Sequence, residues 1–248
     1  MSIAFALFAV PVCTATGTAV AAPTVTLKTT ALPIPGFPHT GNILGAGAVI
    51  RVQYTISGTE YGGFPPPLIG VKYFAPAGSK LHPQGFPVCP PTTLEQIGPQ
   101  ACPHGSLAGP QGSAQGVVSF GAERVPETIS VQPAFGPGGN LEFFLDGHTP
   151  ASLELLATGH VLGAAPPFGL EVEGQVPLIE TVPGAPDASA EQADIEIGAA
   201  YKRGGHTVSY VTVPKQCPKS GLLVRSELSF LGGATAEATY EMPCPRKK

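Results

Sequence analysis

The segment from residue 222 to residue 242 reads LLVRSELSFLGGATAEATYEM, and it alternates apolar and polar side chains on both sides of a glycine pair. The apolar positions are Leu222, Val224, Leu228, Phe230, Ala236, Ala238, Tyr240 and Met242. Successive side chains of a strand point to opposite faces, so this period of two predicts a β-hairpin with one dry and one wet face. The turn is expected at Gly232 and Gly233.

The same period recurs along the chain, most clearly from Val49 to Ile56. Further candidate strands are Thr24–Thr29, Ile69–Phe74, Gln115–Phe120, Thr128–Gln132, Leu141–Leu145, Ser152–Ala157, Leu170–Pro177, Ala193–Tyr201 and Thr207–Val213. Gly- and Pro-containing turn signals separate many of them, and only Thr93–Ile97 resembles a helical turn, which Pro99 would stop. We therefore expect an all-β, antiparallel, β-sandwich-like fold with long Gly/Pro-rich loops.

Cysteines flank the C-terminal hairpin at its open end. The chain has five cysteines, and removal of a leader containing Cys13 would leave four: Cys89, Cys102, Cys217 and Cys244. An even number in an exported chain predicts two disulfides, and proximity favours the pairs Cys89–Cys102 and Cys217–Cys244 among the three pairings allowed. No C-x-x-C spacing occurs, so the pattern does not favour a metal site.

The N-terminal 22 residues carry no charged side chain. An apolar stretch from Ile3 to Val12 precedes small residues and the A-x-A sequence Ala19-Val20-Ala21, which predicts a signal peptide over residues 1–21 and cleavage before Ala22. An uncleaved membrane anchor is the alternative, although the apolar stretch is shorter than the roughly 20 residues a span needs. The expected location is extracellular or in the cell envelope, with membrane contact only through an uncleaved N-terminal segment.

The composition argues against a nucleic-acid partner. The formal net charge is −4, charged residues make up 12%, and Lys and Arg cluster only in the tail from Arg246 to Lys248. Nucleic-acid binding needs grouped cations that displace counterions from phosphate. Apolar residues reach 43% and the alternation is regular, which indicates a folded protein despite the many Gly and Pro residues.

We expect one mature β-sandwich-like domain over residues 22–248, with a division into two subdomains near residue 112 as the alternative. The Pro-rich stretch 30–112 repeats one tripeptide, at Gly36-Phe37-Pro38, Gly63-Phe64-Pro65 and Gly85-Phe86-Pro87. The favoured interpretation is that each Phe anchors a loop to the core. The alternative is an apolar rim that touches lipid, envelope or a partner.

Catalytic patterns are weak in this sequence. The motif Asp146-Gly147-His148 is compatible with an acid–base or metal site, but Asp-Gly is also a preferred pair in hairpin turns. His82, His104, His160 and His206 form no H-x-H or H-E-x-x-H pair. Ser106 lies in Gly105-Ser106-Leu107-Ala108-Gly109, one place early for a nucleophile elbow.

Glutamates in the candidate strands keep a glycosidase among the functions that the sequence allows. The candidates are Glu142, Glu154, Glu171, Glu173 and Glu180, and alternation predicts that most of them face outward as solubilising residues. No phosphate-binding loop occurs, and the sequence indicates no cofactor.

Several segments resemble the uncharacterised secreted, β-rich proteins of soil actinobacteria. The likeness is carried by 32–38 (LPIPGFP), 54–67 (YTISGTEYGGFPPP) and the Cys89-Pro90 to Cys102-Pro103 block. The resemblance implies an exported β-rich protein and supplies no activity or site residue.

The sequence thus favours a secreted or cell-envelope, non-catalytic β protein that binds an apolar ligand or a protein partner. A low charge content and 12 Phe residues suit an apolar ligand held between sheet faces. Two alternatives remain: a secreted hydrolase using Asp146, His148 and a strand Glu, and a membrane-tethered surface protein.

Overall fold

The computed structural model describes residues 22–37, 43–120, 123–148, 152–182, 185–186 and 188–244. The expected signal peptide lies outside these residues. The all-β, antiparallel class is confirmed: one sheet of 11 strands dominates the structure, in the order β1-β2-β12-β5-β6-β7-β8-β9-β3-β16-β17. Its strands are β1 (Thr24–Leu32), β2 (Val49–Ser57), β3 (Leu68–Pro76), β5 (Gly112–Phe120), β6 (Glu123–Phe135), β7 (Leu141–Gly147), β8 (Leu153–Gly163), β9 (Phe168–Gln175), β12 (Ala188–Ile197), β16 (Leu222–Phe230) and β17 (Thr235–Met242).

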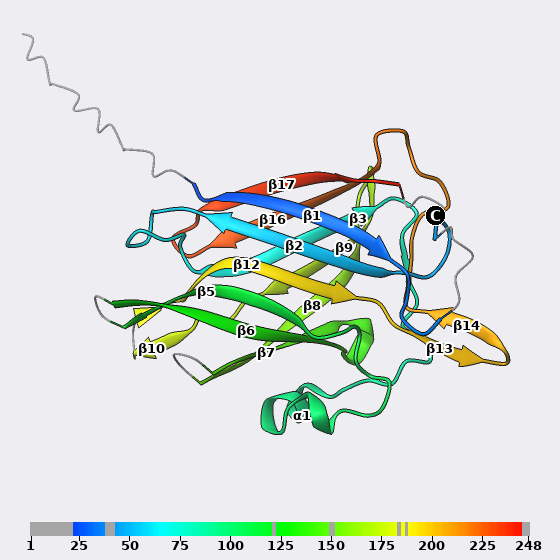
Figure 1. Ribbon diagram of the computed structural model, residues 1–248, viewed down its shortest axis with the longest axis horizontal. Helices are drawn as coiled ribbons and strands as arrows, with labels where there is room; N and C mark the ends of the chain where they lie inside the picture. Colours follow the sequence, from blue (N-terminus) through cyan, green and yellow to red (C-terminus); the bar gives the residue numbers. More distant parts are fainter. Residues whose placement is uncertain are drawn as a thin grey trace, which may run out of the picture.

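The sheet curls until its two edge strands, β1 and β17, meet, so that it is nearly closed into a barrel and its two sides face each other (Figure 1). Every neighbouring pair in the sheet is antiparallel. An odd number of alternating strands leaves the two edges running in the same direction, and no backbone ladder joins them among the described residues. The inner face is therefore enclosed, while the outer face carries most of the charge.

Short elements close the end of the sheet where β12 finishes. They are β4 (Lys80–Leu81), β13 (Ala200–Arg203), β14 (His206–Ser209) and β15 (Val211–Thr212). At the opposite end lies the hairpin of β10 (Glu180–Val182) and β11 (Ala185–Pro186), beside β5 (Figure 1).

The segment 193–201 was predicted as one strand, and the structure breaks it at Gly198 between β12 and β13. Gly198 has φ 154° and runs so close to the backbone that a Cβ atom would lie 2.5 Å from the carbonyl oxygen of Ala48. Only glycine permits this approach, and the chain changes direction there. Residue 112 begins β5, and strands on both sides of it belong to the same sheet.

A covering lobe, defined here as residues 83–111, packs on the outer face of β6, β7 and β8. It contains α1 (Pro91–Gln96) and a 3₁₀ turn (Pro99–Ala101). Leu94 of α1 is fully buried against Phe144. The Cys89 N–H donates to the Phe135 carbonyl at 2.8 Å, which fixes the lobe to the end of β6.

The structure contains both disulfides that proximity favoured. Cys89–Cys102 closes the covering lobe, and Cys217–Cys244 joins the open ends of the β16–β17 hairpin. Disulfides of this kind are typical of an oxidising environment.

Half of the barrel is filled by large side chains. In the strands β1, β2, β3, β16 and β17, here called the filled half, the inward residues form one buried cluster. Its members are Leu27, Val52, Tyr54, Ile56, Val224, Leu228, Phe230 and Ala238. The strands β5 to β9 and β12, here called the hollow half, place several Ala and Gly residues among larger apolar ones on the inner face.

Candidate functional site

A cavity of about 230 Å³ lies inside the curled sheet, between the hollow half and the inner side chains of β2 and β3. Its walls are almost entirely apolar. Val131, Leu145 and Val172 contribute from the hollow half, while Tyr54 and Tyr73 form the opposite wall. An apolar cavity inside a fold is the usual form of a small-molecule site.

Small residues at inward positions explain why the space is left open. They are Ala114, Gly116, Ala157, Gly159, Gly174, Ala190 and Ala193. Protein interiors are otherwise packed as densely as organic crystals, with few voids larger than water. The alternating apolar residues form the cavity wall, and the small size of these side chains leaves the space between the strands unfilled.

Two glycines on neighbouring strands differ in what they permit. At Gly159 a Cβ atom would lie 3.0 Å from Phe143 Cε2 and 3.1 Å from Val172 Cγ1, so those two side chains would have to shift by a few tenths of an ångström to accept it. At Gly174 the nearest atom would be 3.5 Å away, an ordinary contact. The wall at Gly174 therefore has room for a methyl group, while at Gly159 a methyl group fits only if its neighbours move.

The segment 175–179 lines the cavity at the end of β9. Beyond Gln175 it has no regular structure, and the Val176 N–H donates to the Ile69 carbonyl at 3.0 Å. Leu178 of this segment is 41% exposed although it also lines the cavity. An apolar side chain that touches both solvent and the cavity marks this end as the entrance.

A smaller cavity of about 70 Å³ continues towards the opposite end of the barrel. Val52, Tyr73, Val172 and Ile197 line both cavities and form the partition between them.

Tyrosine hydroxyls supply polar groups on the filled side. Tyr54 Oη lies 2.9 Å from Ser226 Oγ, and the Ser226 hydroxyl donates to the Lys72 carbonyl at 2.7 Å. Since the serine proton is used there, the Tyr54 hydroxyl donates to Ser226. Burial raises the pKa of Tyr54 to about 12 and also raises the pKa of Tyr73, so both stay neutral at physiological pH.

Among the described residues that line the cavity, Glu127 is the charged one. It lies on β6 in the same phase as Ile129 and Val131, is 2% exposed and lines the cavity near the entrance. Glu127 was not predicted from the sequence, because the expected strand began at Thr128. Extending the alternation by one residue places Glu127 on the inner face, so the signal was present in the sequence.

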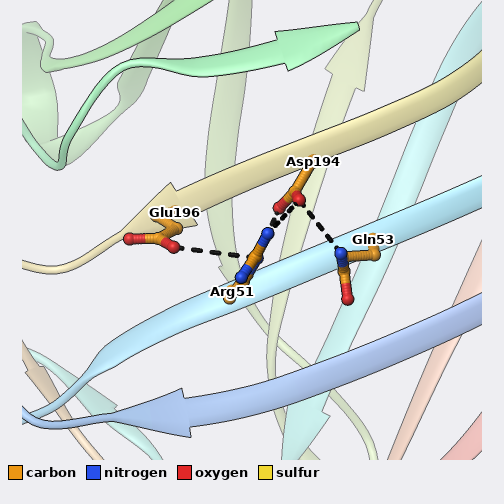
Figure 2. A network of polar contacts seen from close by, with 4 residues as sticks. All are labelled: Arg51, Gln53, Asp194 and Glu196. Carbon is orange, nitrogen blue, oxygen red and sulfur yellow. Dashed lines mark hydrogen bonds and ion pairs between the residues drawn. The ribbon is translucent and has the colours of Figure 1, made fainter.

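On the outer face, a polar network joins β2 to β12 at the boundary between the two halves (Figure 2). Arg51 Nε donates to Asp194 Oδ1 at 2.8 Å, and Arg51 Nη2 pairs with Asp194 Oδ2. Gln53 Nε2 donates to Asp194 Oδ2 at 2.9 Å, and Glu196 Oε1 lies 3.7 Å from Arg51 Nε. The hydrogen bond from Arg51 holds the pKa of Asp194 below its usual range. This network connects strands and does not face the cavity.

Asp146 and His148 meet on the outer face at the end of β7. His148 Nε2 lies 3.2 Å from Asp146 Oδ2, and the His148 side chain is 72% exposed. By alternation Asp146 points away from Leu145, which lines the cavity. The pair therefore stands apart from the enclosed site.

Of the remaining candidates, Glu171 and Glu173 both pair with Lys72 Nζ on the outer face, at 3.6 and 2.9 Å. His160 lies on the outer face of β8 opposite Glu173, and His206 is exposed on β14. Ser106 is buried and donates its hydroxyl proton to the Pro103 carbonyl at 2.6 Å. Within the described ranges, no group of three His, Cys, Asp or Glu side chains is arranged to hold a metal ion.

Glu142 differs from the expectation that outward-facing strand glutamates are exposed to solvent. Alternation points it outward from β7, as predicted, but it is 1% exposed because the covering lobe shields this face. Thr158 Oγ1 donates to Glu142 Oε2 at 2.6 Å. Burial raises the pKa of Glu142, and the hydrogen bond from Thr158 opposes that rise.

The three Gly-Phe-Pro copies behave differently. Phe86 anchors the covering lobe. The centroid of its ring lies 4.7 Å from that of Phe135 and 5.7 Å from that of Tyr210. Phe37 and Phe64 are half-buried beneath Lys202 and Arg124, respectively. The anchoring interpretation therefore holds fully for Phe86 and in part for the other two.

Comparison of the chain with protein-family models, with curated proteins and with solved structures gives no match. No helix in the described part of the chain combines the length and hydropathy needed to cross a membrane.

Proposed function

We propose that this protein is an exported, non-catalytic β protein that binds a small apolar ligand inside the curled sheet. The observation that carries the proposal is the apolar cavity of about 230 Å³ inside the curled sheet. A void of this size without an occupant lowers stability, since its lining atoms lose packing partners. A ligand restores those contacts and removes its own apolar surface from water.

The volume sets the size of the ligand. A dry cavity of about 150 Å³ holds benzene, so this cavity suits roughly nine non-hydrogen atoms by simple scaling. Octan-1-ol has that size. Burial of its chain contributes roughly 6 kcal/mol, which corresponds to a Kd on the order of 10–100 μM.

Export is supported by two separate features. The A-x-A sequence Ala19-Val20-Ala21 follows an apolar stretch, and two disulfides join the four remaining cysteines. N-terminal sequencing of the secreted protein should begin at Ala22. A tethered protein retaining its first residues would instead support the membrane-anchored alternative.

Calorimetric titration with octan-1-ol tests the binding proposal. The parent protein should bind one equivalent. Ala157→Leu, which places a larger side chain on the cavity wall, should weaken binding at least about tenfold, because it occupies part of the ligand volume. Thr55→Leu adds the same side chain on the exposed outer face of β2 and serves as the matched control.

Absence of binding, or equal binding by the parent and Ala157→Leu, would contradict the proposal. Equal binding would place the ligand on another surface of the protein.

A further inference from the structure

The smaller cavity of about 70 Å³ adjoins the larger one, and the proposed function assigns no part of the ligand to it. Its lining is apolar apart from the hydroxyl groups of Tyr73 and Ser79, and no charged side chain occurs among the described residues that form it. Unfilled apolar space lowers stability, because the surrounding atoms lose packing partners. A ligand that reached this space would restore those contacts.

The two cavities lie one after the other along β3. The larger cavity is lined there by Leu68, Val71 and Tyr73. The smaller cavity is lined by Tyr73, Ala75 and Pro76. At a rise of roughly 3.3 Å per residue this lining extends over about 26 Å, whereas a sphere with the combined volume of about 300 Å³ would be about 8 Å across. The combined space is therefore elongated along the strand.

The residues common to both cavities come from four different strands. They are Val52 on β2, Tyr73 on β3, Val172 on β9 and Ile197 on β12. Each occupies an inward position of its strand, and side chains change rotamer on binding more readily than the backbone moves. A thin, flexible ligand can therefore pass between them, whereas a ring or a branched chain needs a wider opening.

We propose that the two cavities form one site for a single unbranched alkyl chain, whose tail occupies the smaller cavity and whose polar end stays at the entrance beside Leu178. This inference rests on the proposed function and names the chemical class of its ligand. The polar end remains near solvent, because burial of a polar group without a hydrogen bond costs free energy. By the scaling applied to the larger cavity, about 300 Å³ suits roughly twelve non-hydrogen atoms, the size of undecan-1-ol.

A series of primary alcohols of increasing chain length tests how far the site extends. From octan-1-ol to undecan-1-ol, the affinity of the parent should rise roughly fourfold with each added methylene group, or about 50-fold in all, because each group is buried in apolar space. Tridecan-1-ol should gain little more. The branched isomer 2-butylheptan-1-ol should bind at least about tenfold more weakly than undecan-1-ol, because its branch does not pass the partition and leaves the smaller cavity empty. Calorimetry below the solubility limit of each alcohol measures the affinities.

Variants at Ala75 show whether the tail lies in the smaller cavity. Ala75 lines that cavity and not the larger one, in the same inward phase as Tyr73. Ala75→Leu should fill the space, so that affinity no longer rises beyond octan-1-ol, while octan-1-ol itself binds as it does to the parent. Ala75→Val fills less of the space and should remove part of the rise. Thr55→Leu places a leucine on the exposed outer face of β2 and should keep the whole series.

An affinity that stops rising at octan-1-ol in the parent would overturn the inference while leaving the proposed function intact. So would a rise up to undecan-1-ol that persists in Ala75→Leu, or equal binding of undecan-1-ol and its branched isomer. If Ala75→Leu does not bind octan-1-ol, the milder Ala75→Val decides the question, and an unchanged rise in that variant overturns the inference. Failure of every alcohol to bind the parent would overturn the proposed function and the inference together.

Discussion

The two halves of the curled sheet follow the same alternating pattern and end with different interiors. In the filled half, Tyr54, Leu228 and Phe230 close the space between β2 and β16. In the hollow half, Ala114, Ala157 and other small residues occupy the equivalent inward positions and leave a cavity.

The difference shows that hydrophobic periodicity and side-chain volume carry separate information. Periodicity decides which face of a strand is buried. Volume decides whether the buried face is packed solid, because interiors tolerate few voids unless the residues are too small to fill them. One half of this molecule is packed with large side chains, and the other half leaves a cavity, which is where we propose that a ligand binds.

Truncation of a large residue in each half should separate these roles most clearly. Phe230 has no exposed surface, so Phe230→Ala should lower the free energy of unfolding by about 3–5 kcal/mol. Phe143 lines the cavity and is half-buried, so Phe143→Ala should cost less, about 2 kcal/mol. Urea denaturation measures both. Equal losses would show that the hollow half is packed as tightly as the filled half.

Each half is associated with one disulfide. Removal of either disulfide should lower the free energy of unfolding by a similar amount. Cys217 and Cys244 are 27 residues apart, and Cys89 and Cys102 are 13 apart. Chain entropy predicts losses of about 3.5 kcal/mol for the paired change Cys217→Ala/Cys244→Ala and about 3 kcal/mol for Cys89→Ala/Cys102→Ala. Denaturation of each variant without reductant provides the measurement.

The second disulfide variant has a local readout as well. Loss of Cys89–Cys102 should speed hydrogen exchange in the covering lobe, while exchange in the β16–β17 hairpin stays slow. Faster exchange throughout the sheet would mean that the lobe and the hairpin unfold as one unit.

Glu142, which lies beneath the covering lobe, should make the stability of the protein depend on pH. Burial raises the pKa of its carboxyl group in the folded state, so the folded protein holds this proton more tightly than the unfolded chain does. The stabilising contribution of protonation is present at low pH and is lost as pH rises through the folded-state pKa. Glu142→Gln should therefore gain stability relative to the parent as pH rises.

Denaturation in buffers from about pH 3.5 to about pH 8 should show this divergence, since glutamate titrates near the lower end of that range when unfolded. Parallel stability curves for Glu142→Gln and the parent would indicate that the carboxyl group is solvated in the folded protein.

The network at the boundary between the halves should have the smallest effect. Arg51 and Asp194 are partly exposed, so Asp194→Asn should cost at most about 1 kcal/mol at neutral pH. The pKa of Asp194 is lowered in the folded protein, so its contribution is present at neutral pH and is lost as pH falls through that pKa. A loss near that of Phe230→Ala would show that this network, rather than the core, holds the two halves together.

Most strands could be predicted from the sequence, whereas the closure of the sheet could not. Alternation identified the C-terminal hairpin and Val49–Ile56 directly, because each strand buries one face. The insertion of β12 between β2 and β5 depends on contacts between residues far apart in the chain, which a local pattern does not encode.

The candidate site shows the same limit. Asp146 and His148 were conspicuous in the sequence, and the structure places them on the outer face. Glu127 was less conspicuous, yet its phase with Ile129 and Val131 carried the information that it faces inward.

The sequence by itself determined the all-β class, the two disulfide pairs and the inward face of most strands, because these follow from period-two alternation and from short separations along the chain. Only the tertiary structure decided that small residues from β5, β8, β9 and β12 gather around one cavity and that Glu142 lies beneath a covering lobe. Enclosed volume and burial depend on which strands face each other across the interior, and that is settled only when distant segments pack.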